Sequence, residues 1–237
     1  MQTPKVTIFL TLCFLFLPAL NLKSQDLQAK EQAVPVFNGI SISVPGEVYI
    51  IQGPSQRLIL EGTERVMDNL VTEVRRGKLI ISAPPRWNFR RNDQLKVYIT
   101  VSELNSLEIS GSAHIYTEGS LSTDIMAVTI SGSGRVEFEE LSADELSSVI
   151  SGSGRVYVGS GTELTNQAIK ISGSGRVDSA SVPAGKVNIT ISGSGRCYVY
   201  ALADLHVRVS GSGRVVYTGT PLVDSRISGS GRIMSSR

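Results

Sequence analysis

A seven-residue phrase, ISGSGRV, recurs through the second half of the chain with little change. The copies begin at Ile109 (ISGSAHI), Ile130, Ile150 and Ile171 (all ISGSGRV), Ile191 (ISGSGRC), Val209 (VSGSGRV) and Ile227 (ISGSGRI). Successive copies start 18 to 21 residues apart. A period near 20 residues is typical of a solenoid in which each repeat forms one coil. It is too short for propeller blades or for repeats built from helix pairs.

The residues around each copy alternate between apolar and polar side chains. Ile130, Val136 and Phe138 share one parity, whereas Ser131 and Arg135 share the other. Period-two alternation predicts strands with one buried face, and stacked coils would pair equivalent strands in register about 4.8 Å apart. We therefore predict an all-β fold, a parallel β-helix-like solenoid of ~20-residue coils.

The two glycines of the phrase share the parity of the buried residues. Gly132 and Gly134 therefore either let another part of the coil approach closely or adopt positive φ at a corner. Both interpretations are architectural, and the sequence does not choose between them.

Residues 34–108 are less regular. The segment 42–48 (ISVPGEV) matches the phrase, and 60–66 (LEGTERV) and 81–87 (ISAPPRW) are weaker echoes. A short helix is expected within 64–70 and a long loop over 84–93. We expect residues 34–108 to form an irregular β-rich N-terminal section, or cap, of the solenoid, followed by regular coils over 109–237. A separate small β-domain is the alternative.

The N-terminus has the features of a secretory signal peptide: Lys5, an apolar run over 6–20 and a small residue, Ser24. We assign residues 1–25 to the signal peptide and 26–33 to a linker. Export places the protein in the periplasm, at the cell surface or outside the cell. The mature chain would hold 21 basic and 21 acidic residues, without the basic excess of nucleic-acid-binding proteins and without a transmembrane segment.

The combination of FNGISISVPGEVYIIQG from Phe37, LILEGTERVMDNLVTEV from Leu58 and the serial ISGSGRV coils resembles the head GIN domain family. This family comprises exported proteins of Gram-negative bacteria described as putative auto-transporter adhesins. The resemblance covers about residues 34–233. It implies a β-helix-like fold, an envelope or surface location and no established catalytic residues.

The motifs that carry chemistry elsewhere are incomplete in this chain. The GSGR segments lie in strand pattern and not at the start of a helix, so they do not form a phosphate-binding loop. His114 occupies the arginine slot of its copy and is expected to be a solvated member of that row, and Cys197 fills a valine slot in the core. We therefore predict no catalytic residues, no metal site and no cofactor.

One polar position keeps its identity in six consecutive coils. These residues are Arg135, Arg155, Arg176, Arg196, Arg214 and Arg232. Stacking would arrange them in a column, where like charges on neighbouring strands repel each other. Solvent screening, guanidinium stacking and acids alongside, such as Glu137 and Asp178, would offset the repulsion. The functional interpretation is an anion-binding stripe for acidic glycan, lipid phosphate or an acidic partner.

These observations favour an exported, non-enzymatic cell-envelope or surface protein, an adhesin or interaction module built on a β-solenoid. The expected partners are an acidic glycan, lipopolysaccharide or a surface protein, and not nucleic acid. The alternative is a carbohydrate-active β-helix enzyme acting on acidic polysaccharide, with paired acids near the cleaved bond. A purely structural spacer is a third option.

Overall fold

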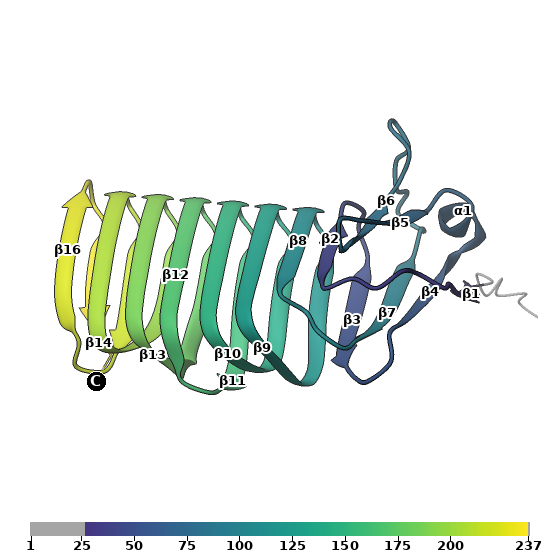
Figure 1. Ribbon diagram of the computed structural model, residues 1–237. Coiled ribbons are helices and arrows are strands. Elements are labelled where there is room, and N and C mark those ends of the chain that lie inside the picture. Colours follow the sequence, from purple (N-terminus) through teal and green to yellow (C-terminus); the bar gives the residue numbers. More distant parts are fainter. Residues whose placement is uncertain (1–26, 237) are drawn as a thin grey trace, which may run out of the picture.

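The computed structural model describes residues 27–236 and confirms the predicted solenoid. The fold is nearly all-β, with 71% strand and 2% helix, and it coils through about six turns of roughly 20 residues. The coils stack into a rod with the N-terminal section at one end (Figure 1). No helix among the described residues is long and apolar enough to cross a membrane. The predicted signal peptide, residues 1–25, lies outside the described residues.

The strands fall into two groups. The N-terminal section contains β1 (Leu27–Glu31), β2 (Gly39–Ile42), β3 (Glu47–Gln52), β4 (Arg57–Thr63), α1 (Glu64–Met67), β5 (Val71–Arg75), β6 (Lys78–Ser82) and β7 (Leu95–Val101). The regular coils contain β8 (Ser106–Gly111), β9 (His114–Gly132), β10 (Arg135–Gly152), β11 (Arg155–Gly161), β12 (Leu164–Gly173), β13 (Arg176–Gly193), β14 (Arg196–Gly211), β15 (Arg214–Thr218), β16 (Leu222–Ser228) and β17 (Arg232–Ser235).

Each regular coil consists of two strand segments joined at the Ser–Gly corner of the phrase. One segment ends at the corner and the other begins at the arginine, so the corners line up along one edge of the rod (Figure 1). Equivalent residues pair in parallel and in register, as in Ile130 with Ile150 and Ile150 with Ile171. The pairing therefore repeats the sequence period without a shift at the phrase.

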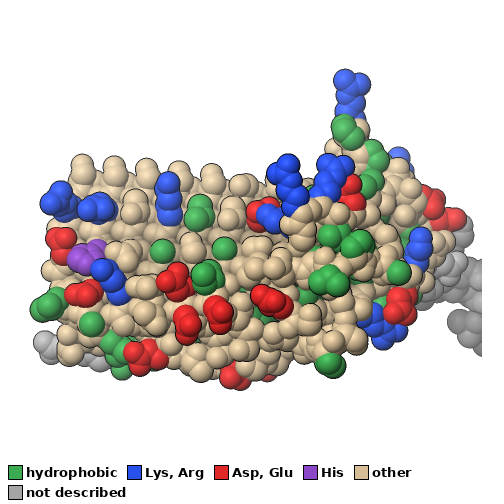
Figure 2. All heavy atoms as spheres, in the orientation of Figure 1, with side chains coloured by type: hydrophobic (Ala, Val, Ile, Leu, Met, Phe, Trp, Pro, Cys, Tyr) green, Lys and Arg blue, Asp and Glu red, His purple; other side chains and the backbone are tan. Residues whose placement is uncertain are grey.

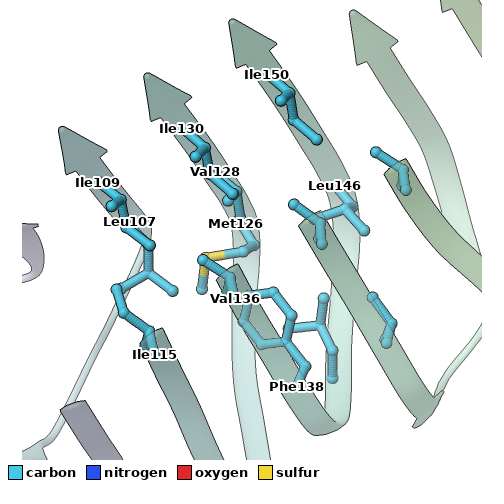
Figure 3. Close-up of a cluster of buried hydrophobic side chains, with 14 of the residues drawn as sticks. Leu107, Ile109, Ile115, Met126, Val128, Ile130, Val136, Phe138, Leu146 and Ile150 are labelled. Carbon is cyan, nitrogen blue, oxygen red and sulfur yellow. The ribbon is translucent and has the colours of Figure 1, made fainter. Parts of the chain in front are cut away.

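The core lies between the two strand segments of each coil. Ile109, Ile130 and Ile150 line one wall, and Val136 and Phe138 face them from the other (Figure 3). All five side chains are at most 2% exposed. The alternation that predicted strands thus separates inward from outward residues correctly, because one parity fills this interior.

The two glycines of the phrase have different roles, so each of the two interpretations applies to one of them. Gly132 forms the corner with φ of 124°, and a Cβ there would lie 2.5 Å from the carbonyl oxygen of Gly111. Gly154, the second glycine of its copy, has no such φ, but a Cβ there would lie 2.5 Å from Cγ2 of Ile130. The first glycine is required by backbone conformation and coil spacing, and the second by contact with the preceding core isoleucine.

The N-terminal section contains two further coils whose order in space differs from their order in sequence. Strand β2 lies between β8 and β6, since Ile42 pairs with both Ile109 and Ile81, and strand β3 lies between β9 and β7. The match at 42–48 is therefore confirmed. The echo at 81–87 is confirmed only at its start, because Ile81 pairs with Ile42 but the residues after Ser82 form a loop. The echo at 60–66 is wrong, because β4 runs antiparallel to β7 and leads into α1.

The outer end of the N-terminal section is stabilised by side-chain contacts that are not repeated elsewhere in the solenoid. Strands β1 and β4 pair antiparallel, and the predicted short helix is α1. The predicted long loop lies between β6 and β7. In it Asp93 accepts a hydrogen bond from Arg65 Nε at 3.1 Å, and Trp87 packs edge-on against Phe89. The hydrophobic core and the sheet continue from this section into the coils. The boundary at residue 108 stays a prediction.

The C-terminal coil packs on one side only within the described chain. Val223 and Ile227 are each 43% exposed, whereas their partners in the preceding coil, Leu205 and Val209, are at most 3% exposed. The difference in exposure shows how much a second neighbouring coil adds to the burial of these core positions.

Candidate functional site

The six arginines of the phrase form the predicted column. Each pairs in register with the next through the parallel ladder: Arg135 with Arg155, Arg155 with Arg176, Arg176 with Arg196, Arg196 with Arg214 and Arg214 with Arg232. Their backbones are locked in place, because the amide of each arginine from Arg155 on donates to a phrase glycine of the preceding coil, as Arg176 does to Gly154 at 3.0 Å. The side chains consequently leave the rod about one strand spacing apart.

The arginines of this column differ in their partners. Arg135 pairs with Glu137 at 3.3 Å and Arg176 with Asp178 at 2.6 Å, the two acids expected to offset repulsion. Each acid lies two residues after its arginine, on the same outward face of the strand. Within residues 27–236, Arg155, Arg196, Arg214 and Arg232 form no ion pair and are exposed. The column therefore alternates, over its first four members, between neutralised and free guanidinium groups.

The column borders a shallow groove of about 550 Å³. The lining residues are Arg135, Glu137, Ser153, Arg155, Val156, Tyr157, Ser174, Arg176, Asp178 and Arg196. Tyr157 stands between the two acids in the next outward column and is 45% exposed. The Arg176 guanidinium lies 4.2 Å from the centre of the Tyr198 ring, so a cation–π contact holds it as well. The groove offers cationic, acidic and aromatic groups within four coils.

A stacked row of tyrosines continues this second column toward the N-terminal section. Tyr49 stacks on both Tyr98 and Tyr116, with ring centres 5.4 Å apart in each pair. Tyr49 donates its hydroxyl hydrogen to Glu47 at 3.1 Å, and burial together with this bond raises the pKa of Tyr49 to about 12. A second hollow of about 270 Å³ beside these rings shares Glu137 and Tyr157 with the arginine groove. The two hollows therefore adjoin each other at these two residues.

The predicted place of His114 in the arginine row is confirmed, since it pairs in register with Arg135. Its expected solvation is wrong, because the side chain is 24% exposed and its Nδ1 lies 2.8 Å from the Tyr116 hydroxyl. Burial lowers the pKa of His114, Arg135 lowers it further, and Glu137 opposes both. The packed tyrosine row, which the sequence pattern did not reveal, accounts for the difference.

The remaining candidates for chemistry are placed as follows. Cys197 is fully buried in the valine column, and burial raises the pKa of its thiol. Residues 27–236 contain no group of three or more His, Cys, Asp or Glu side chains arranged to hold a metal ion. Glu139 accepts a hydrogen bond from the Gly119 amide at 2.7 Å, and Glu137 and Asp178 pair with arginines. These carboxylates thus have structural partners on the face that they share with the groove.

The opposite broad face of the rod, formed by the strand segments that end at the corners, has a different distribution of charge. Figure 2 shows this face, with charged side chains scattered over it and the Ser–Gly corners as an even row of small residues along its edge. Its cations include Lys170, Arg208 and Arg226 in exposed outward positions of one column, with Thr190 between the first two. This face therefore provides arginines outside the groove for comparison.

Solved structures share this fold. A crystal structure of a putative adhesin from Bacteroides fragilis matches with a TM-score of 0.84 at 24% identity, covering 90% of this chain and 98% of that one. A putative lipid binding protein from Parabacteroides distasonis (TM-score 0.70, 24% identity) and a putative adhesin from Parabacteroides merdae (TM-score 0.71, 18% identity) cover the same shares.

Among proteins with curated descriptions, none matches this chain. The family resemblance carried by the repeated phrase and by the segments from Phe37 and Leu58 is confirmed over most of the sequence. Residues 36–221 match the family described as "putative auto-transporter adhesin, head GIN domain", and the chain belongs to that family.

Proposed function

We propose that this chain is an exported, non-enzymatic interaction module that binds acidic ligands along its arginine column. The observation that carries the proposal is the pair of free arginines, Arg155 and Arg196, which line one groove on either side of the neutralised Arg176. The parallel ladder fixes the backbones of these arginines, and a guanidinium group binds carboxylate, sulfate or phosphate through paired hydrogen bonds. Membership of an adhesin family supports an exported interaction module of this kind.

The carbohydrate-active enzyme is not favoured. Glycoside hydrolysis requires one carboxyl group as acid and a second as base or nucleophile. In the groove, Glu137 and Asp178 are each paired with an arginine two residues away. Each of these carboxylates thus has a guanidinium partner, and the groove lining contains no other acid.

The test is binding of a panel of acidic glycans, lipopolysaccharide and anionic lipid vesicles to the wild type and to Arg155→Ala/Arg176→Ala/Arg196→Ala. We expect the triple variant to lose most of the binding, and binding by the wild type to weaken steeply as salt increases. Arg→Lys at the same positions should weaken binding less than Arg→Ala, since lysine keeps the charge but not the planar fork.

A matched control removes the same charge from the opposite face, in Lys170→Ala/Arg208→Ala/Arg226→Ala. This variant should bind as the wild type does. Equal loss in both triple variants would mean that only net charge matters, and no loss in either would contradict the proposed role of the column. Vesicle binding without glycan binding would assign the column to a lipid surface instead of a glycan.

A further inference from the structure

The charges along the groove alternate, unlike those of a plain cationic stripe. Arg155 and Arg196 are free within the described residues, and between them Arg176 is held by Asp178 at 2.6 Å and by the Tyr198 ring. Two coil steps separate the backbones of the two free arginines, a distance of about 10 Å at the strand spacing of a β-sheet. A ligand that satisfies both therefore needs acidic groups about that far apart.

The acidic groups of the groove favour hydroxyl-bearing ligands. Asp178 and Glu137 line the groove beside Tyr157, and each keeps carboxylate lone pairs beyond the one arginine contact. Such oxygens accept hydrogen bonds from hydroxyl groups but repel further anions. A chain with a charge at every unit would place some of its charges opposite these acids.

The aromatic rings in the same column provide a flat surface. Tyr157 is 45% exposed in the groove, and the neighbouring hollow is lined by Tyr49, Tyr116 and the same Tyr157. A tyrosine face binds C–H groups through its negative quadrupole while its hydroxyl stays hydrated. Pyranose rings present such C–H faces, and their rims carry hydroxyl groups.

Building on the proposed acidic-ligand function, we propose that the groove binds an extended oligosaccharide with an acidic group on every second sugar. Its carboxylates or sulfates pair with Arg155 and Arg196, one ring packs on Tyr157, and the intervening neutral sugar donates hydroxyl hydrogens to Asp178. One disaccharide in an extended chain spans about the distance between the two free arginines, which is two strand spacings.

The experiment compares two probes of equal length by calorimetry. Hyaluronan decasaccharide carries a carboxylate on every second sugar, and decagalacturonate carries one on each. We expect hyaluronan to bind the wild type several-fold more tightly despite its lower charge. Arg155→Ala should weaken hyaluronan binding about tenfold, and Tyr157→Ala should weaken it about two- to tenfold while Tyr157→Phe does not.

The decisive variant is Asp178→Asn, which frees Arg176 without removing a guanidinium. It should raise the affinity for decagalacturonate several-fold and narrow or abolish the preference for hyaluronan. Asp144→Asn makes the same charge change at an exposed site outside the groove lining and should leave both affinities unchanged.

The outcomes separate the two proposals. If the wild type binds decagalacturonate as tightly as hyaluronan, or Asp178→Asn leaves the preference intact, the alternating ligand is wrong while the anion-binding column stands. If polyphosphate or phosphatidylglycerol vesicles outcompete both glycans, the ligand is not a sugar. If no acidic probe binds, both proposals fail.

Discussion

In the regular coils, Ile130, Ile150 and Ile171 stack on one another through the same register at every step. In the N-terminal section, by contrast, Arg65 contacts Asp93 and Trp87, and Lys78 pairs with Glu108, each through contacts that occur once. The coils are held together by one kind of interface that is repeated at every step, whereas the N-terminal section is held together by several different contacts. A substitution at one coil interface therefore tests an arrangement that all the coil interfaces share, whereas a substitution in the N-terminal section tests one contact.

The largest expected loss of stability comes from substitutions of the corner glycines. Two of them, Gly111 and Gly132, distinguish backbone strain from overpacking. Gly111 and Gly132 have nearly the same φ, 126° and 124°, but a Cβ at Gly111 would have nothing within 4 Å, whereas one at Gly132 would meet the Gly111 carbonyl. Gly132→Ala should cost about 2–6 kcal/mol, from backbone strain plus overpacking, and Gly111→Ala only the strain of about 1–3 kcal/mol. Urea unfolding of both variants measures the difference, and equal losses would show that coil spacing at the corner is not constrained.

The next effect concerns the core of a middle coil. Ile171→Ala removes a side chain that is 1% exposed and should lower the free energy of unfolding by about 2–5 kcal/mol. Ser174→Ala, on the exposed side of the same phrase, should change it by no more than about 0.5 kcal/mol. Denaturant midpoints in the reverse order would mean that the inward and outward faces are assigned wrongly.

In the N-terminal section, Asp93→Asn should lower stability locally by about 1–3 kcal/mol, because a mostly buried carboxylate loses its charge-assisted bonds to Arg65 and to the Arg90 amide. The Arg65 guanidinium holds the pKa of Asp93 below its usual range. The stabilisation is therefore present above about pH 4 and is lost as the pH falls through the lowered pKa.

The chain's single tryptophan, Trp87, reports this region, since its ring centre lies 4.7 Å from the Arg65 guanidinium carbon. Denaturant titrations followed by Trp87 fluorescence should show a wild-type advantage over Asp93→Asn at pH 6 that shrinks at pH 3. An advantage that is the same at both pH values would contradict the assigned ion pair.

The smallest effect is expected at Cys197. Cys197→Val restores the residue found at this slot in four other coils and should change stability by less than about 1.5 kcal/mol. Burial raises the pKa of the thiol, so a thiolate-specific reagent should label it only when the coil opens. Rapid labelling in native buffer would contradict its burial.

The sequence alone was sufficient for those features that each copy repeats. The parallel register, the inward parity and the arginine column all follow from the period, and the acids at 137 and 178 were identifiable because they stand two residues after an arginine. The spatial order of the N-terminal coils was not predictable, since Ile42, Ile81 and Ile109 begin chemically similar segments and only their tertiary pairing distinguishes them.

Two groups of side chains escaped prediction for related reasons. The Tyr98, Tyr49 and Tyr116 stack appears only after that pairing is known, although each tyrosine occupies the same slot relative to its strand. Gln167 and Ser179 bond to each other at 2.7 Å inside the core, at positions that other coils fill with apolar residues. Their contact joins the two walls of the coil, which a pattern along one strand does not describe.

Because neighbouring coils pair in the same register at every phrase, the length of the rod changes by one strand spacing for each coil that is added or removed. A deletion that runs from one phrase to the next, such as residues 130–149, joins Thr129 to Ile150 and leaves a complete ISGSGRV at the junction. Such an event shortens the rod by one strand spacing, about 4.8 Å, without creating a new kind of interface. Unequal exchange between copies of the phrase can therefore set how far the arginine groove extends from the N-terminal section, and it does so in whole steps.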